Sequence, residues 1–503
     1  MENIRVRFAP SPTGALHIGG IRTALYNYLF AKKTGGTFIL RIEDTDQTRY
    51  VPGAEEYIIE SLKWVNLLPA EGQGFGGNFG PYRQSERKDI YERHAQILIE
   101  KGQAYYAFDT PEELEAARAA NPNFKYDAVT RLTLKNSLTL SETEVRQRID
   151  SGAPYVIRLK VPENEAIVIQ DLIRGEVVFQ SRELDDKVML KSDGLPTYHL
   201  ANVVDDRLMR ISHVIRGEEW LPSTAHHVLL YRAFGWEAQM PQFAHLPLIL
   251  KPDGNGKLSK RDGTRLGIPV FPLSWKGATP EDSFTGFREA GFLPEAVVNF
   301  LAFFGWNPGT EQEIFSVKEL AEAFTIEKIG RSGSRFDFEK AKWYNHQYIM
   351  NAENERLTDL VAPILTEKGV QAERQFLEKF VGLMKDRVTL LPEFWEKGSY
   401  FFTEDFEYDA GMITKKWKPE NAPKFEKLIE GIQDLERFAA VSLDALVHHF
   451  MEANELKPGE VMPILRIALS GTMQGPSVFD MMELLGKERT VARLKKAMQS
   501  FSN

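Results

Sequence analysis

The sequence predicts an α/β protein in which a parallel-sheet domain carries an α+β insertion and is followed by an all-helical C-terminal part. Three observations lead to this prediction. Residues 4–42 alternate strand, loop, helix and strand patterns, β-rich runs of mixed character lie between about 100 and 190, and beyond residue 335 apolar side chains recur at helical spacing.

Length and composition limit the possible functions. The chain has 503 residues, which at roughly 150 residues per domain corresponds to three to four domains. Lys and Arg number 62 against 71 Asp and Glu, so the net charge is −9, and the pI of 5.7 argues against a protein that coats nucleic acid non-selectively. Because the chain has no cysteine, disulfides, iron–sulfur clusters and thiolate zinc sites are excluded.

No targeting or membrane segment is expected. Residues 1–5 lack the apolar core of a signal peptide, and no run approaches the roughly 18 apolar residues that cross a bilayer. The sequence therefore predicts a soluble protein in the cytoplasm.

The N-terminal segment predicts a βαβ unit. Residues 4–8 alternate apolar and cationic side chains as in a short strand, a loop rich in Pro and Gly follows at 9–14, and a helix starts near Gly19. The pair at 35–36 ends that helix, and residues 37–42 form a second strand. Two strands joined by a helix imply a parallel sheet with a site at the carboxyl ends of its strands, where the acidic cluster 43–46 lies.

The remaining segments differ in pattern. The Gly-rich residues 72–80 match no phosphate-binding spacing and are interpreted as a surface loop. The mixed segment between about 100 and 190, with β-like runs at 155–159 and 176–179, is interpreted as an insertion, after which βαβ character resumes near 197–204 and 214–219. Two apolar stripes make the last third helical: Leu377, Phe380, Val381, Met384, Val388 and Leu391, then Phe425, Leu428, Ile429, Ile432 and Leu435.

Two segments carry residues suited to phosphate chemistry. Residues 10–20 join the first strand to the helix, and their small side chains let backbone amides approach a nucleotide phosphate. His17 could donate a hydrogen bond to charge that develops on phosphate, while Gly19 admits a base and ribose. The second segment, residues 257–261 (Lys-Leu-Ser-Lys-Arg), follows the loop 253–256. Each segment by itself is more often structural, the first in a core and the second on a solvated face.

Together, in this order and about 240 residues apart, the two segments resemble the HIGH and KMSKS signatures of class I aminoacyl-tRNA synthetases. Five further blocks resemble the glutamyl-tRNA synthetase family: residues 7–14, 41–46, 80–87, 198–206 and 215–220. Residues 479–489 resemble the bacterial form of that family, so the resemblance covers essentially the whole chain. Gly20 stands at the last His of the first signature, as is usual in this family, whereas Leu258 replaces Met and Arg261 replaces the final Ser of the second.

The resemblance implies a glutamate–tRNA ligase acting in protein synthesis. ATP and L-glutamate would give glutamyl-adenylate, and the glutamyl group would then move to the 3′-terminal adenosine of tRNA(Glu). The first step must hold a carboxylate against an anionic α-phosphate, which calls for cationic and dipolar groups rather than a protein nucleophile. The catalytic candidates are His17, Lys257 and Lys260. Gly254 and Gly256 suit a mobile loop whose lysines engage fully as pyrophosphate leaves.

For ATP with Mg²⁺, the resemblance implies binding by both signatures and by two outlying residues, Glu219 and Leu250, near the ribose and base. The full set is Ser11, Thr13, Gly14, His17, Gly19, Gly20, Glu219, Leu250, Lys257, Leu258, Ser259, Lys260 and Arg261. Leu250 could equally be a core strand residue. No protein metal cage is expected, since Mg²⁺ travels with the nucleotide. No zinc is expected either, because Tyr105 and Tyr106 occupy the region where some bacterial relatives have cysteine ligands.

For the amino acid, the resemblance assigns Arg7, Tyr198 and Arg216 to the γ-carboxylate, Glu43 to the ammonium group, and Asn202 with Ser11 to supporting hydrogen bonds. The chemistry agrees, because an interior-facing arginine needs an anionic partner and glutamine would leave it poorly paired. A structural salt bridge is the alternative for either arginine.

The same resemblance divides the chain into five parts. A Rossmann-like catalytic domain (1–100 and 191–255) encloses an acceptor-binding insertion (101–190), and a stem-contact connector with the KMSKS-type loop (256–335) precedes a helical anticodon-binding domain (336–503). Arg387 matches a position that helps select the third anticodon base, with a solvated helix-face arginine as the equal alternative. The expected partners are tRNA(Glu), L-glutamate and ATP, with no membrane, and a monomer is expected.

Three alternative functions are disfavoured by features of the sequence. A glutaminyl enzyme usually carries a β-barrel anticodon domain, and a truncated queuosine-modifying relative lacks the C-terminal third, whereas this C-terminal third is predicted to be helical. A non-catalytic tRNA-binding paralogue would keep only the scaffold. The intact His17, Lys257, Lys260, Arg7 and Glu43 argue against that paralogue.

Overall fold

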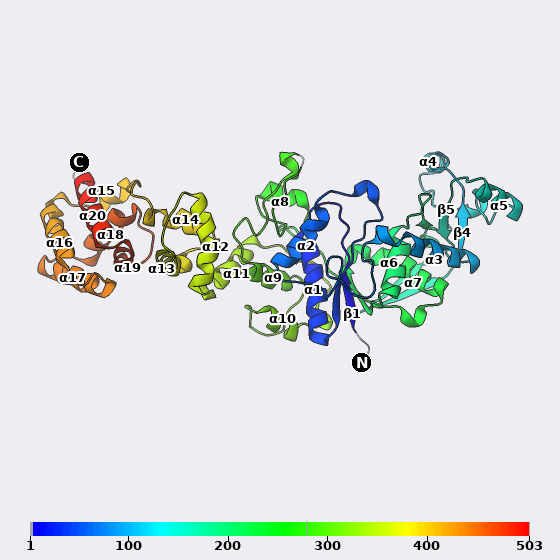
Figure 1. The fold of residues 1–503 in the computed structure, drawn as a ribbon, viewed down its shortest axis with the longest axis horizontal. Helices are drawn as coiled ribbons and strands as arrows, with labels where there is room; N and C mark the ends of the chain where they lie inside the picture. The colour runs from blue at the N-terminus through cyan, green and yellow to red at the C-terminus, as the bar shows by residue number, and fades with distance from the viewer. Residues whose placement is uncertain (1–3, 278, 502–503) are drawn as a thin grey trace. The chain divides into compact units, whose positions relative to one another are not determined.

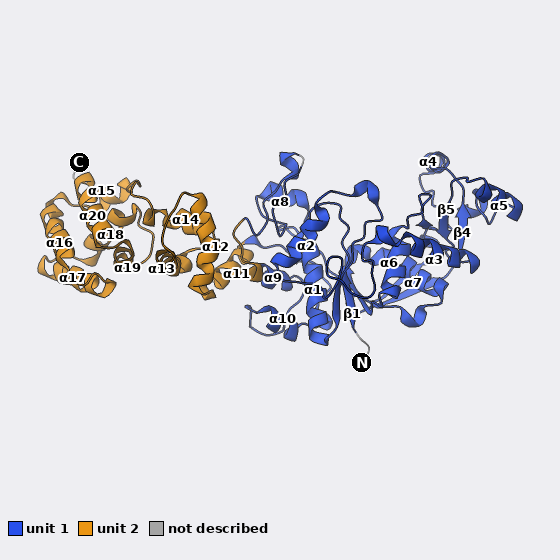
Figure 2. Cartoon of the chain, in the orientation of Figure 1, with its two compact units in different colours: residues 1–289, 297–338 blue, residues 290–296, 339–503 orange. Residues whose placement is uncertain are grey.

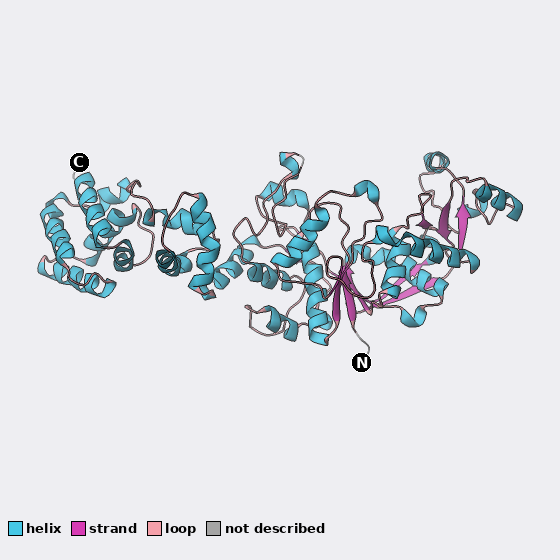
Figure 3. Cartoon of the chain, viewed as in Figure 1, coloured by secondary structure: helices cyan, strands magenta, loops and turns pink. Residues whose placement is uncertain are grey.

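The computed structural model describes residues 4–277 and 279–501. The chain divides into two compact units, residues 1–289 with 297–338 and residues 290–296 with 339–503 (Figure 2). All strands of the described residues belong to the first unit, as Figure 3 shows. The predicted α/β class with a helical C-terminal part is confirmed.

The predicted N-terminal βαβ unit is present. Strands β1 (Arg5–Phe8), β2 (Thr37–Leu40) and β3 (Glu71–Gly72) form a parallel sheet in that order. Helix α1 (Ile18–Thr34) joins the first two strands and lies against β1 (Figure 1). It ends at Gly35, whose φ of +66° is the left-handed conformation that glycine adopts without strain. The carboxyl ends of β1 and β2 therefore open beside the N-terminus of α1.

A second sheet has the order β7-β6-β10-β9. Strands β9 (His213–Gly217) and β10 (Gln242–Leu246) are parallel, and β10 also pairs in parallel with β6 (Ala166–Asp171). Strand β7 (Gly175–Gln180) closes a hairpin with β6. This hairpin lies within the predicted insertion, yet its strand β6 extends the sheet that carries residues 213–217.

The first unit also contains the helices α2 (Ala54–Trp64), α3 (Lys88–Glu100), α6 (Tyr198–Leu208) and α7 (Leu221–Phe234). Helix α7 packs on β6 of this sheet and is joined by α6 and α3, whereas α2 lies apart from them beside α1 (Figure 1). Residues 197–204, where βαβ character was expected to resume, form the start of α6, and residues 214–217 belong to β9. The Gly-rich residues 72–80 form turns that are mostly exposed, as predicted for a surface loop.

The rest of the predicted insertion is a small antiparallel sheet, β4-β5-β8, with helices beside it. Its elements are β4 (Ala104–Ala107), α4 (Pro111–Ala120), α5 (Glu142–Asp150), β5 (Val156–Leu159) and β8 (Val188–Leu190). In its interior the Tyr105 hydroxyl donates to Asp186 over 2.6 Å, and Arg131 forms an ion pair with the same carboxylate at 3.2 Å. Tyr105 thus anchors a buried polar cluster.

The first unit is completed by α8 (Lys260–Leu266), α10 (Val317–Ala323), the short parallel pair β11 (Ile249–Leu250) and β12 (Ser334–Arg335), and residues 297–302 of α9 (Pro294–Ala302), whose first residues belong to the second unit. Among the described residues, no three His, Asp or Glu side chains are grouped as metal ligands. None of the helices found there has both the length and the apolar character needed to cross a bilayer.

The second unit is all-helical in its described residues. It contains α11 (Phe338–Asn351), α12 (Asn354–Glu367), α13 (Arg374–Met384), α14 (Glu393–Gly398), α15 (Ala410–Lys416), α16 (Ala422–Asp434), α17 (Ala440–Ala453), α18 (Pro458–Ser470), α19 (Val478–Leu485) and α20 (Lys487–Phe501). Both apolar stripes found in the sequence face its core, where Phe380 and Ile432 are fully buried. The helical spacing of the apolar residues therefore predicted this unit correctly.

The Asp186 cluster gives a stability prediction. Replacing Asp186 with Ala leaves the buried Arg131 guanidinium without its closest counter-charge, which we expect to lower the free energy of unfolding by about 3 kcal/mol. Urea denaturation followed by circular dichroism measures the change. The double variant Asp186→Ala/Arg131→Met should recover part of the loss, because it removes the unpaired cation. An equal or larger loss in the double variant would contradict this explanation.

Candidate active site

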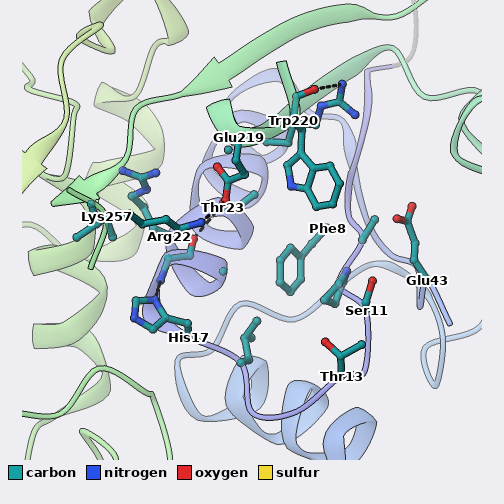
Figure 4. Close-up of a pocket in the computed structure, with 18 of the residues that line it drawn as sticks. Phe8, Ser11, Thr13, His17, Arg22, Thr23, Glu43, Glu219, Trp220 and Lys257 are labelled. Carbon is teal, nitrogen blue, oxygen red and sulfur yellow. Dashed lines mark hydrogen bonds and ion pairs between the residues drawn. The ribbon is translucent and has the colours of Figure 1, made fainter. Parts of the chain in front are cut away.

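A cavity of about 620 Å³ lies at the carboxyl ends of β1 and β9 and beside the N-terminus of α1 (Figure 4). The structure brings most of the predicted site residues together around it: Arg7, Ser11, Thr13, His17, Gly19, Gly20, Glu43, Tyr198, Asn202, Arg216, Glu219, Lys257, Leu258, Ser259 and Lys260. Residues more than 200 positions apart in the sequence thus share one cavity wall.

His17 is the N-cap of α1 and has a defined tautomer. Its Nδ1 accepts a hydrogen bond from the Gly19 amide over 3.1 Å, so the ring proton must reside on Nε2. That Nε2 is buried and meets no acceptor among the described residues. Burial, followed by the charges of Lys257 and Lys260, lowers the pKa of His17 to about 3. The imidazole is consequently neutral at physiological pH, with an unused N–H donor, and the residue lines the cavity.

The two glycines after His17 have different roles. A Cβ at Gly20 would stand 2.4 Å from the end of the Leu16 side chain, so a larger residue there would require Leu16 to move. A Cβ at Gly19 would meet only His17 Nδ1, at 3.4 Å. Gly19 therefore keeps space open in the cavity, whereas Gly20 lets the loop fold back on α1.

The segment after β11 places two lysines at the cavity. Leu258 is buried and its amide donates to the Ile249 carbonyl over 2.9 Å, which anchors the segment. Ser259 caps α8 through Asp262, its amide donating over 3.0 Å. Lys257 Nζ lies 2.6 Å from Glu219 Oε1 in a half-exposed ion pair.

Lys260 has no such partner within the described chain. Its Nζ lies over the Phe271 ring, 5.6 Å from the centroid, and burial lowers its pKa. A Cβ at Gly14 would approach this Nζ to 3.3 Å, and Gly14 has a φ of +130°. Gly14 does not line the cavity, but it makes room for the ammonium group that does.

Arg216 is a buried cation whose hydrogen-bond partners are all neutral. Its Nε donates to His245 Nε2 over 3.1 Å, one terminal nitrogen donates to the Tyr198 hydroxyl over 2.7 Å, and the other donates to Thr224 Oγ1 over 2.8 Å. Within the described part of the chain, no carboxylate forms an ion pair with it. Burial lowers the pKa of this guanidinium. A buried charge without a counter-ion is costly, so this site is prepared for an anionic ligand.

Arg7 differs from Arg216 because a carboxylate already binds it. Its Nε and one terminal nitrogen donate to Asp206 over 3.1 and 3.0 Å. Glu43 in turn accepts hydrogen bonds from Arg41 over 2.9 Å and from Asn202 over 3.2 Å. For Arg7 the structural salt bridge considered as an alternative therefore exists, although its side chain still lines the cavity.

Four predicted residues lie elsewhere. Leu250 and Arg261 do not line the cavity, and Leu250 lies on strand β11 beside Gly333, partly buried rather than in the core. Gly14 does not line the cavity either, but leaves space for Nζ of Lys260. Arg387 belongs to the second unit, in a short 3₁₀ turn (Lys385–Arg387), where its guanidinium pairs with Asp386.

The structure adds cavity residues that motif comparison did not select: Phe8, Arg22, Thr23, Arg49 and Trp220. Figure 4 shows Phe8 and Trp220 bordering the space between His17 and Glu43. Arg22 is buried and donates to the carbonyls of Pro247 and Phe304 over 2.5 and 3.2 Å. Arg22 could have been identified from the sequence, because it is a charged residue within the apolar stripe of the first helix, one turn after the helix starts.

Two protein families match the chain. Residues 3–343 match the class I tRNA synthetase catalytic domain for glutamate and glutamine (E and Q), and residues 356–498 match an anticodon binding domain. Curated relatives extend over the full length. The glutamate–tRNA ligase of Porphyromonas gingivalis is 55% identical over 99% of this chain and 98% of its own, and that of Phocaeicola vulgatus is 54% identical over 99% of each.

Solved structures agree. A glutamate tRNA ligase from Elizabethkingia meningosepticum, in complex with its amino acid, superposes with a TM-score of 0.95 at 48% identity and covers 99% of this chain and 100% of its own. The glutamate–tRNA synthetase from Elizabethkingia anophelis gives a TM-score of 0.93 at 48% identity, with the same coverage.

The state of His17 can be tested directly. We expect the ¹⁵N shifts of its imidazole to report an Nε2–H tautomer that does not titrate between pH 5 and pH 9, because its pKa of about 3 leaves the ring neutral throughout. The spectrum of His17→Asn, whose amide oxygen can still accept from Gly19, identifies the signal by its loss. A midpoint near the ordinary histidine pKa would contradict the buried, neutral ring.

Proposed function

The chain belongs to the class I tRNA synthetases for glutamate and glutamine, and we propose that it is a glutamate–tRNA ligase. It activates L-glutamate with ATP to glutamyl-adenylate and transfers the glutamyl group to the 3′-terminal adenosine of tRNA(Glu). The names of full-length relatives at 52–55% identity support this activity. The structural observation that supports glutamate as the amino acid is that buried Arg216 has only neutral hydrogen-bond partners.

Arg216 supplies the selectivity for a carboxylate. Its guanidinium is buried, is held by neutral groups and lines the cavity. Because no carboxylate of the described chain pairs with it, the γ-carboxylate of glutamate would be its counter-ion. Glutamine would bring a neutral amide and leave the cation unpaired. Loss of such a pair is worth several kcal/mol, which supports strong rejection of glutamine. Tyr198, whose hydroxyl accepts from Arg216, orients the same group.

Glu43 receives the ammonium group of the substrate. Its carboxylate lines the cavity and is fixed by Arg41 and Asn202, which both donate to Oε1. Oε2 has no hydrogen bond to these donors and can accept from the ammonium group. Ser11 lines the same wall and supplies a further polar group. Glutamate is thereby bound through charges of opposite sign at its two ends.

Activation requires a carboxylate oxygen of glutamate to attack the α-phosphorus of ATP as the bond to pyrophosphate breaks. His17, whose Nε2–H meets no acceptor among the described residues, and Lys260 both line this cavity, and we assign to them the stabilisation of negative charge in the five-coordinate transition state. Lys257 must leave Glu219 to join them. Because that ion pair is half-exposed, breaking it costs about 1 kcal/mol or less.

Magnesium enters with the nucleotide. Among the described residues no three acidic or His side chains are grouped as metal ligands. We propose that ATP oxygens and water would supply the ligands of Mg²⁺. We assign no step to it, and we expect no zinc in the small sheet of the insertion.

Transfer follows when a ribose hydroxyl of the terminal adenosine attacks the glutamyl carbonyl carbon and AMP leaves. A second cavity of about 510 Å³ shares Ser11, Glu43, Tyr198 and Trp220 with the first, and we assign the terminal adenosine to it. Because the walls are shared, the hydroxyl would arrive beside the activated carboxyl group.

The remaining assignments rest on the same family resemblance. The helical second unit reads the anticodon, with Arg387 as a candidate contact, and the five-part division given above describes the chain's organisation. A glutaminyl enzyme is disfavoured because the described residues of the second unit contain no strand from which a β-barrel could be built. We further propose that the protein works as a cytoplasmic monomer.

The first functional prediction concerns substrate choice. ATP–pyrophosphate exchange should occur with glutamate, not with glutamine, and only when tRNA is present. The assay compares both amino acids with and without tRNA at equal enzyme concentration. Exchange with glutamine alone, or no exchange under any condition, would overturn the proposed function. Charging assays with tRNA(Glu) and tRNA(Gln) then define the range of tRNA substrates.

A second prediction concerns Arg216. Arg216→Gln keeps hydrogen-bonding groups but removes the charge, so kcat/KM for glutamate should fall about 10²- to 10³-fold while the KM for ATP changes little. Arg22→Gln serves as the matched control, because it removes another buried cation of the same cavity whose donors bind main-chain carbonyls. Arg22→Gln should lower thermal stability and leave the KM for glutamate within about 3-fold. Equal effects of the two variants on glutamate would remove Arg216 from its assigned role.

A further inference from the structure

Behind Arg216 lies a fully buried pair that the mechanism above does not use. His245 on β10 and Asp171 at the end of β6 both have side chains with no exposed surface, and Nδ1 of His245 lies 2.6 Å from Asp171 Oδ2. On the other edge of the ring, Nε2 lies 3.1 Å from Nε of Arg216. The three side chains form one chain of contacts from the β6–β7 turn to the cavity.

The chemistry of the two ends sets the tautomer of His245. A guanidinium can only donate, so Nε2 must accept, and an ionised carboxylate can only accept, so Nδ1 must carry the proton. Burial would by itself raise the pKa of Asp171, but the hydrogen bonds from His245 and from backbone amides lower it. Burial also lowers the pKa of His245. Both directions agree with a neutral imidazole between a carboxylate and a guanidinium.

We propose that Asp171 and His245 are positioning and specificity-determining residues, which orient Arg216 for the substrate carboxylate while leaving its positive charge unneutralised. This inference rests on the proposed function, in which Arg216 binds the γ-carboxylate of glutamate. Neither residue is in the lining of the glutamate cavity, so both act through Arg216.

Arg7 provides the internal comparison. Asp206 binds Arg7 directly through two hydrogen bonds, and that cation is thereby neutralised. At Arg216 the corresponding carboxylate stands one imidazole ring further away. The ring fixes the direction of Nε but brings no charge of its own. The same fold therefore holds one arginine as a structural ion pair and a second one as an anion receptor.

Asp171 is itself held rigidly. Its Oδ1 accepts from the amides of Ile173 and Arg174 over 2.9 and 2.8 Å, which closes the turn between β6 and β7. Arg174 in that turn donates to the His245 carbonyl over 3.2 Å and pairs with Glu218 at 2.5 Å. The groups that bear on His245 are thus Asp171 and Arg174 from the hairpin, Arg216 from β9 and Thr224 from α7, whose hydroxyl lies 3.2 Å from Nε2.

Asp171→Asn tests the proposal with almost no change of volume. The asparagine oxygen can still accept from both turn amides, but the amide group that replaces Oδ2 donates and forces the proton of His245 onto Nε2. That proton then faces the N–H of Arg216. We expect the KM for glutamate to rise about 10- to 100-fold in tRNA-dependent exchange, with the KM for ATP within about 2-fold of wild type.

Two substitutions of His245 provide a second measurement. His245→Asn retains a donor for Asp171 but loses the acceptor for Arg216, whereas His245→Gln can place its amide oxygen near the position of Nε2. We expect His245→Asn to raise the KM for glutamate at least about 10-fold and His245→Gln to raise it by about 3-fold or less. This difference is independent of Asp171→Asn and decides the matter if that variant does not fold.

Asp186→Asn is the matched control, because it alters a buried carboxylate of the small insertion sheet that accepts hydrogen bonds from Tyr105, Arg131 and the Val161 amide. It should leave the KM for glutamate unchanged. The positioning role is overturned if Asp171→Asn raises the KM for glutamate and the KM for ATP to the same extent. It is also overturned if His245→Asn and His245→Gln raise the KM for glutamate equally. Unaltered glutamate kinetics in both Asp171→Asn and His245→Asn, with active wild-type enzyme, would overturn it too. A wild-type enzyme that fails to exchange with glutamate would instead refute the proposed function.

Discussion

The arrangement of the site depends on Arg41, a guanidinium with no exposed surface that is surrounded by three carboxylates. It lies 2.7 Å from Asp206, 2.9 Å from Glu43 and 3.9 Å from Asp205. Burial alone would lower the pKa of Arg41, but the three carboxylates hold it well above the usual value. Because none of these charges can be left unpaired at low cost, the strand ends and α6 are forced to meet at one place.

This network also decides which cations remain for ligands. Asp206 is shared between Arg41 and Arg7, so Arg7 has a structural ion pair although its side chain also lines the cavity, and Asp205 is occupied by Arg87, Gln84 and Tyr91. Arg216 and Lys260 are outside this network and have no carboxylate partner among the described residues. The positive character of the cavity thus arises from the positions at which the protein provides no counter-charge. Arginine content alone could not have located those positions.

What could be predicted from the sequence was local or belonged to a motif. The βαβ unit follows from alternation in residues 4–8, the helical spacing after Gly19 and the stop at Gly35, which are all short-range signals. Most cavity residues were found because two signatures and the blocks around them resemble a known family. The pairing of Arg7 with Asp206 could not be found, since the partners are 199 positions apart. Asp171 was missed because its contact with His245 depends on the parallel pairing of β6 with β10.

The net charge of −9 and a cavity for anionic substrates are compatible because the two act over different distances. Exposed charges are screened within about 10 Å at ordinary salt, so the overall acidity governs whether any polyanion approaches the surface. His17, Lys260 and Arg216 line the cavity and are partly or fully buried, so their electrostatic effect is screened far less. An acidic surface therefore opposes indiscriminate binding of RNA, while the cavity offers cations without a carboxylate partner, Lys260 and Arg216, beside the carboxylate of Glu43. Selectivity for one folded RNA must then come from shape and from a few local phosphate contacts rather than from total charge.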